Sequence, residues 1–124
     1  MPSGPDRGQS TVEFALVLPV LVVTLVGLVH LGLLARDQVL VAHAAREGVR
    51  AAAVDPDPRA AERAAEAAGP LDAARLRVET RNRGGPGSRV TVVVTYLAVN
   101  RIPLLRTIID DRKLRAEATM RVER

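Results

Sequence analysis

Residues 14–35 read FALVLPVLVVTLVGLVHLGLLA, and this stretch decides the fold. It contains no charged residue over 22 positions. At about 1.5 Å per residue, a helix of this length spans the hydrocarbon core of a bilayer, which is about 30 Å thick. The interruptions, among them Pro19 and His30, are of types that membrane helices tolerate. We therefore predict a transmembrane helix over residues 9–35.

Two other interpretations of the apolar run are weaker. A chain of 124 residues is too small to enclose a helix that is apolar on every side. A cleaved secretory signal has an apolar part of about 7–15 residues that ends near an A-x-A site. Ala42-His43-Ala44 has that pattern, but it lies beyond Arg36 and Asp37, and the apolar run is longer. We therefore expect the helix to be retained as an anchor.

The helical pattern continues past the apolar run. Apolar residues recur at spacings of three and four between Val41 and Ala52, and charged residues fall on another face. No Pro or turn cluster interrupts the chain before Asp55-Pro56-Asp57-Pro58. The pattern predicts one helix from about Ser10 to about Val54, with its first part in lipid and its second part in water.

A second, shorter helix follows. Asp57-Pro58 is typical of an N-cap followed by Pro at the first helical position, and Gly69-Pro70 predicts the end. Between them, charged residues lie on one face and alanines on the other, which suits close packing. The alanines are Ala60, Ala61, Ala64, Ala65 and Ala68.

The period then changes to two, which indicates strands. Residues 76–80 and 114–122 alternate apolar and polar side chains, and residues 90–99 are β-branched on both faces, as in a covered central strand. Gly84-Gly85-Pro86-Gly87 predicts one turn, and residues 100–111 a longer loop. We expect an α+β fold in which a three-stranded antiparallel sheet packs on the two helices. The domain would comprise residues 36–124.

Enzyme chemistry is not indicated. The chain has two His and no Cys, and the common nucleophile, phosphate-loop and metalloprotease motifs are absent. The adjacent acids Asp110 and Asp111 fit a loop surface, and His30 fits a structural role within the span. We expect no catalytic residue, no cofactor and no metal site. The net charge of +4 comes almost wholly from Arg, but acids are interspersed and no aromatic lies among the bases, which disfavours a nucleic-acid partner.

A short polar leader and one acid precede the apolar run. Gly8 is followed by Gln9, then by Glu13, Phe14 and Pro19 within GQSTVEFALVLPVL. An acid near a helix start is favoured by the helix dipole, and Ser10 with Glu13 has the spacing of a capping box. Neither feature explains the leader that ends in Arg7-Gly8. The stretch, together with AAREGVRAAAV at 44–54, resembles TadE-like proteins, the pseudopilins of the tight-adherence (Flp) pilus system.

The resemblance implies a pilin-like fold, a function and a topology. Residues 1–8 would be a prepilin-type leader that a prepilin peptidase cuts between Gly8 and Gln9. Glu13 would then neutralise the new amine of an adjacent subunit, so the chain would assemble with other pilins or pseudopilins and the Tad machinery. Phe14 stands where Flp pilins and several processed pseudopilins carry Tyr. The domain after the span is larger than in the main pilins, which implies a minor subunit.

The orientation and the function have alternatives. Basic residues follow the span more often than they precede it, so the charge bias alone would place the domain inside the cell. The resemblance places it outside, on a single-pass anchor in the cytoplasmic (inner) membrane, and we expect that orientation. A membrane-anchored envelope-binding module with no pilus role is the second interpretation. A basic nucleic-acid-binding domain is the third.

Overall fold

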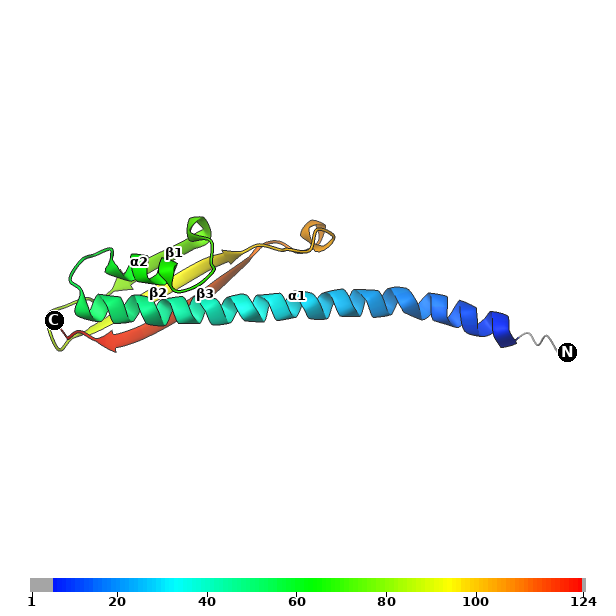
Figure 1. Cartoon of the computed structure of the whole chain (residues 1–124), viewed down its shortest axis with the longest axis horizontal. Helices are drawn as coiled ribbons and strands as arrows, with labels where there is room; N and C mark the ends of the chain where they lie inside the picture. Colours follow the sequence, from blue (N-terminus) through cyan, green and yellow to red (C-terminus); the bar gives the residue numbers. More distant parts are fainter. Residues whose placement is uncertain (1–5, 124) are drawn as a thin grey trace. The chain divides into compact units, whose positions relative to one another are not determined.

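The protein is described by a computed structural model that covers residues 6–123. The chain forms two compact units: the N-terminal unit ends at Gly32 and the C-terminal unit begins at Leu33. Helix α1 contributes to both units. The C-terminal unit also contains a second helix and three strands, as Figure 1 shows. The α+β class is confirmed. The elements are α1 (Asp6–Val54), α2 (Ala60–Ala67), η1 (Ala73–Arg75), β1 (Leu76–Arg81), β2 (Arg89–Ala98), η2 (Leu105–Thr107) and β3 (Arg112–Arg121).

Helix α1 is longer than predicted at its N-terminus. It begins at Asp6, four residues before Ser10, and ends at Val54 as expected. Pro19 lies inside it and has no N–H to donate to the carbonyl of Ala15, yet the helix continues on both sides. Residues 1–5 of the expected leader lie outside the described residues.

The sheet is an antiparallel meander in the order β1-β2-β3, as predicted. In the register of β1 and β2, Leu76 lies opposite Tyr96, and in that of β2 and β3, Tyr96 lies opposite Leu114. Strand β2 is paired on both edges, and its residues are buried on both faces over much of its length. The central position that its β-branched composition predicted for β2 is therefore confirmed.

The core of the C-terminal unit lies between one sheet face, the later part of α1 and α2. These elements approach closely at Gly48 of α1. A Cβ at that position would lie 3.2 Å from the carbonyl oxygen of Ala61 and 3.2 Å from a methyl of Val92. The core consists mainly of small side chains, which permits this spacing. Its buried members are Val41, Ala44, Ala45, Val49, Ala52, Ala53, Ala61, Ala65, Val90, Val92, Val94, Tyr96, Ala98 and Val122.

The start of α2 differs from the prediction. The helix begins at Ala60 with Arg59 at its N-cap position, so Asp57 is not the N-cap. Instead, the Asp57 carboxylate accepts the backbone N–H of Arg59 at 2.9 Å, and Asp57 forms a turn before the helix. The predicted alanine face is confirmed, because Ala60, Ala61 and Ala65 are buried.

Candidate functional site

The candidate assembly segment, Gly8–Pro19, is a continuous part of α1, and its side chains are exposed. Phe14, the single phenylalanine of the chain, is 67% exposed. A Cβ added at Gly8 would meet no atom within 4 Å. The fold of this chain therefore does not itself require glycine at position 8.

Glu13 lies one helical turn after Gln9. The Gln9 amide nitrogen donates a hydrogen bond to the Glu13 carboxylate, with 3.1 Å between Nε2 and Oε1. Because α1 begins at Asp6, Ser10 is not an N-cap, and the capping-box interpretation is wrong. Glu13 is also beyond the first turn, where the helix dipole acts. The two local explanations for an acid at this position are therefore weakened.

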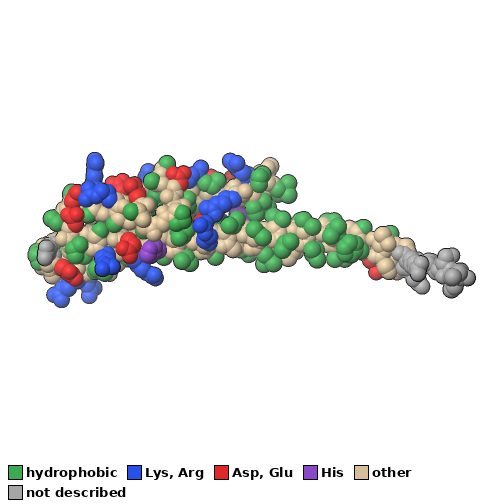
Figure 2. All heavy atoms as spheres, in the orientation of Figure 1, with side chains coloured by type: hydrophobic (Ala, Val, Ile, Leu, Met, Phe, Trp, Pro, Cys, Tyr) green, Lys and Arg blue, Asp and Glu red, His purple; other side chains and the backbone are tan. Residues whose placement is uncertain are grey.

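The apolar surface of the segment continues along the helix. Large hydrophobic side chains are exposed from Val12 to Leu31, and Figure 2 shows them along the outside of this helical stretch. Thr24 does not interrupt the surface, because its hydroxyl donates to the carbonyl oxygen of Val20 at 2.8 Å. Within residues 6–123, α1 is the one helix long and apolar enough to cross a membrane, and its most apolar window is not buried. A helix of this kind fits a single-pass membrane anchor.

The two histidines lie in different surroundings. His30, within the apolar run, is only 9% exposed, and its structural role stays a prediction. His43 is exposed on α1, as its place on the polar face predicted. Among the described residues, no group of three or more His, Asp or Glu side chains has an arrangement that could hold a metal ion.

Residues 8–50 match the family model described as TadE-like protein. Over these residues the chain is similar to TadE-like proteins. The match covers α1 from Gly8 to Arg50 and confirms the resemblance found in the sequence. Comparisons with curated proteins and with solved structures give no match. The roles of Gly8, Gln9, Glu13, Phe14 and Pro19 in cleavage and assembly stay predictions.

Just after the apolar run, helix α1 carries a buried acid that the sequence analysis did not single out. The side chain of Asp37 is 4% exposed. Its Oδ1 lies 3.4 Å from a guanidinium nitrogen of Arg101 and 3.8 Å from one of Arg36. Arg101 comes from the loop between β2 and β3, 64 residues away in the sequence. The pair joins this loop to the part of α1 that follows the apolar run, and only the tertiary fold reveals it.

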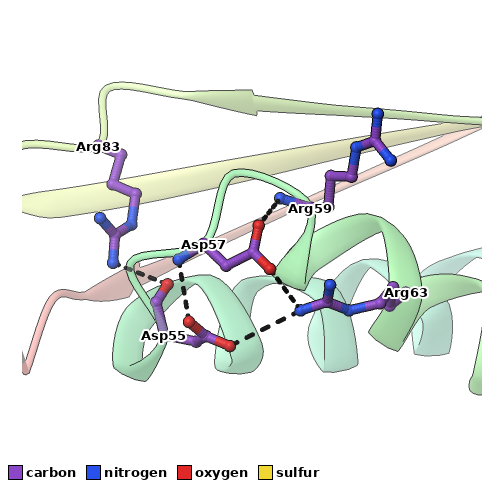
Figure 3. Close-up of polar contacts among 5 residues, drawn as sticks. All are labelled: Asp55, Asp57, Arg59, Arg63 and Arg83. Carbon is purple, nitrogen blue, oxygen red and sulfur yellow. Dashed lines mark hydrogen bonds and ion pairs between the residues drawn. The ribbon is translucent and has the colours of Figure 1, made fainter.

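A second polar cluster closes the connection between α1 and α2 (Figure 3). The Arg83 guanidinium donates to the carbonyl oxygens of Ala52 at 3.0 Å and Asp55 at 2.8 Å, at the C-terminus of α1. Arg63 of α2 lies 2.7 Å from the Asp57 carboxylate. The N–H of Arg59 and then the Arg63 guanidinium lower the pKa of Asp57 below its usual value. These contacts hold a turn and the end of a helix, so we assign the cluster a structural role.

The outer face of the sheet, away from the helices, carries alternating charges. Glu79 and Glu117 flank Val93 of β2 on either side. Arg81 pairs with Glu79 at 2.9 Å, and Arg115 with Glu117 at 3.5 Å. The hydrogen bond from Arg81 lowers the pKa of Glu79. Part of the basic charge on this face is therefore neutralised within the chain.

Proposed function

We propose that this chain is a minor pilin or pseudopilin, anchored in the cytoplasmic membrane, that takes part in assembly of a Tad-type surface pilus. One observation carries the proposal. The TadE-like match coincides with a helix that presents Glu13 outward at the edge of an apolar surface left exposed from Val12 to Leu31. A surface of this size is covered in the cell by lipid, by other helices or by both. The role is structural and not enzymatic.

The proposed assembly step depends on two groups one helical turn apart, the α-amino group of Gln9 and the carboxylate of Glu13. A prepilin peptidase cuts between Gly8 and Gln9, and the new α-amino group on Gln9 is positively charged. Gln9 becomes the first residue of α1 and Glu13 the fifth. In hydrocarbon an unpaired ion costs several kcal/mol, so the Glu13 carboxylate is favoured where the amine of an adjacent subunit meets it. The pairing selects the axial register between neighbouring helices.

The rest of the apolar helix supplies the packing. Phe14 lies next to the acid, and Pro19 lies in the run that follows it, where neighbouring helices can contact them. In this topology the leader is cytoplasmic and residues 36–124 are extracytoplasmic. The downstream arginines that oppose this orientation in a charge count belong to a folded unit that also contains acids, such as Asp37 and Glu47.

Replacement of Glu13 tests the pairing. We expect E13Q to insert into membranes as the wild type does, because Gln keeps the size and removes only the charge. It should lose incorporation into the pilus machinery, measured by co-purification and cross-linking in cells that build the pilus. The matched control is E47Q, on the same helix but outside the apolar run. Normal incorporation of E13Q would contradict the proposal.

The second candidate is an envelope-binding module on a plain anchor, which the basic residues of the outer sheet face favour. These residues include Arg77 and Lys113. Mass spectrometry of the native protein separates the two candidates. A mature N-terminus at Gln9 supports the pseudopilin, and an intact Met1 supports the plain anchor. We do not propose a nucleic-acid partner, since Glu79 and Glu117 pair with arginines of this face.

A further inference from the structure

The loop between β2 and β3 exposes apolar side chains at its apex. Leu104 is 75% exposed and Ile108 is 79% exposed. Both values exceed that of every other large hydrophobic residue among those described, including Leu16 of the apolar helix at 71%. We call residues 102–109 the apolar tip; its sequence is IPLLRTII. An exposed cluster of this composition at one end of a domain calls for a covering partner.

The tip is held in place by its stem. Asn100 is 4% exposed and bridges the two sides of the loop. Its backbone N–H donates to the Asp111 carboxylate at 3.1 Å, and its side-chain amide donates to the carbonyl oxygen of Ile109 at 3.4 Å. Its own side-chain oxygen accepts the N–H of Ile102 at 3.1 Å. The outward position of the tip therefore belongs to an organised loop, in which Asp111 has a structural task.

The contacts of α1 show which end of the C-terminal unit carries the tip. Gly48 lies against Val92, near the start of β2. Gln38 donates to the carbonyl oxygen of Arg115, which lies opposite Thr95, later in β2. Strand β2 thus runs back along α1 toward Leu33, and the loop extends beyond its end, as the orange segment in Figure 1 shows.

That end of the unit is the one joined to the apolar helix. The charge-free run ends at Ala35, and the Asp37–Arg101 pair holds the base of the loop two residues later. If the charge-free run ends where the helix leaves hydrocarbon, as the proposed anchoring requires, the base of the loop lies near the level of the lipid headgroups. Within the C-terminal unit, the tip extends from the base of the loop at the same end at which α1 enters the unit.

We propose that the apolar tip inserts into the interfacial layer of the bilayer leaflet that faces the C-terminal unit. Leu104 and Ile108 enter the boundary between headgroups and acyl chains. Arg106, which lies between them in the sequence, contacts lipid phosphates, with its aliphatic stem beside the apolar residues. The unit is then attached to the membrane at two points, the helix and the tip. This inference rests on the membrane anchoring in the proposed function, but not on pilus assembly.

Spin labels test the insertion directly, because the chain contains no Cys and single-Cys variants need no background changes. The full chain carries L104C or I108C and is reconstituted into vesicles of phosphatidylcholine and phosphatidylglycerol. Frequent collision of the spin label with oxygen indicates that the label lies in lipid. Frequent collision with a water-soluble nickel chelate indicates that it lies in water. The matched control is M120C, on an exposed apolar residue near the other end of the sheet. A label on L21C shows whether the apolar helix itself lies in lipid.

We expect the tip labels to show a several-fold higher ratio of oxygen to nickel accessibility than the M120C label. Tip labels as water-accessible as M120C, with L21C in lipid, would overturn the insertion and leave the anchor intact. L21C in water would overturn the anchor itself and with it the proposed function. Tip labels shielded from both reagents would indicate a protein partner, which also overturns insertion into lipid.

A second probe excludes an artefact of the label. The chain contains no Trp, so L104W introduces a single indole. We expect its emission to be quenched several-fold more by lipids brominated near the headgroup end of the acyl chain than by lipids brominated near the terminal methyl. Equal emission with and without bromine would overturn the proposal.

Discussion

Replacement of Arg101 by Ala tests whether the buried Asp37 depends on a cation from the loop. Asp37 is 4% exposed in its side chain, and its cationic neighbours are Arg101 at 3.4 Å and Arg36 at 3.8 Å. R101A removes the nearer guanidinium and its hydrogen bond. The carboxylate then keeps only the more distant Arg36, which is half exposed and better solvated.

The size of the effect follows from these distances. At an effective dielectric constant of about 20, two unit charges 3.4 Å apart attract by about 5 kcal/mol before desolvation is subtracted. Removing one partner of a fully buried pair costs about 3–5 kcal/mol. Arg101 is 42% exposed and Arg36 remains, so both values must be reduced for solvent screening. We expect R101A to lower the free energy of unfolding by about 1–3 kcal/mol.

Urea unfolding of the full chain in detergent measures this effect. Tyr96, the single tyrosine, is buried in the core, so its emission follows the C-terminal unit and not the apolar helix. A double-mutant cycle with D37N isolates the pair, and in the D37N background R101A should cost less than about 0.5 kcal/mol. R106A is the control from the same loop. An equal cost of R101A in both backgrounds would refute the reasoning.

Two further predictions concern the packing of α1 and the turn after it. G48L should lower the free energy of unfolding by about 1–3 kcal/mol, because Ala61 and Val92 leave no room for the side chain; an unchanged urea midpoint would contradict this. The pKa of Asp57 is lowered in the folded state, so its stabilisation is complete above the unfolded pKa of about 3.9 and is lost as the pH falls through the folded pKa. D57N should therefore be less stable than wild type at pH 7, with a difference that shrinks below pH 4, and a difference constant between pH 3 and 7 would argue against this pairing.

The elements of this fold could be predicted because each has a clear period. The charge-free run, the alanine face of α2 and the alternation in β3 each report a local geometry that the tertiary structure keeps. The central place of β2 also followed from its residues, since a strand apolar on both faces needs cover on both. The prediction was wrong at helix starts. Asp57 shows why, because the same carboxylate can cap a helix or a turn that precedes it, and the sequence does not distinguish them.

The candidate site divides in the same way. Gly8, Gln9 and Glu13 could be proposed from the sequence because the argument for them rests on spacing along one helix, and their roles stay predictions. The pairing of Asp37 with Arg101 could not, because it depends on the register that places the β2–β3 loop beside α1. The exposure of Leu104 and Ile108 was also hidden. An apolar loop sequence is equally compatible with burial against the core, and only the positions of Asn100 and the strand ends show that the tip points outward.

The distance between anchor and core favours an assembly subunit over a tethered binding module. A module that samples the envelope is usually joined to its anchor by a flexible linker rich in Gly, Ser or Pro. Here the first buried core residue, Val41, follows the end of the charge-free run at Ala35 by only six residues, and α1 is unbroken between them. The buried core therefore starts within two helical turns of the end of the charge-free run. Under the proposed anchoring, this short helical connection suits a subunit that packs beside neighbours in the same membrane better than a module that reaches distant ligands.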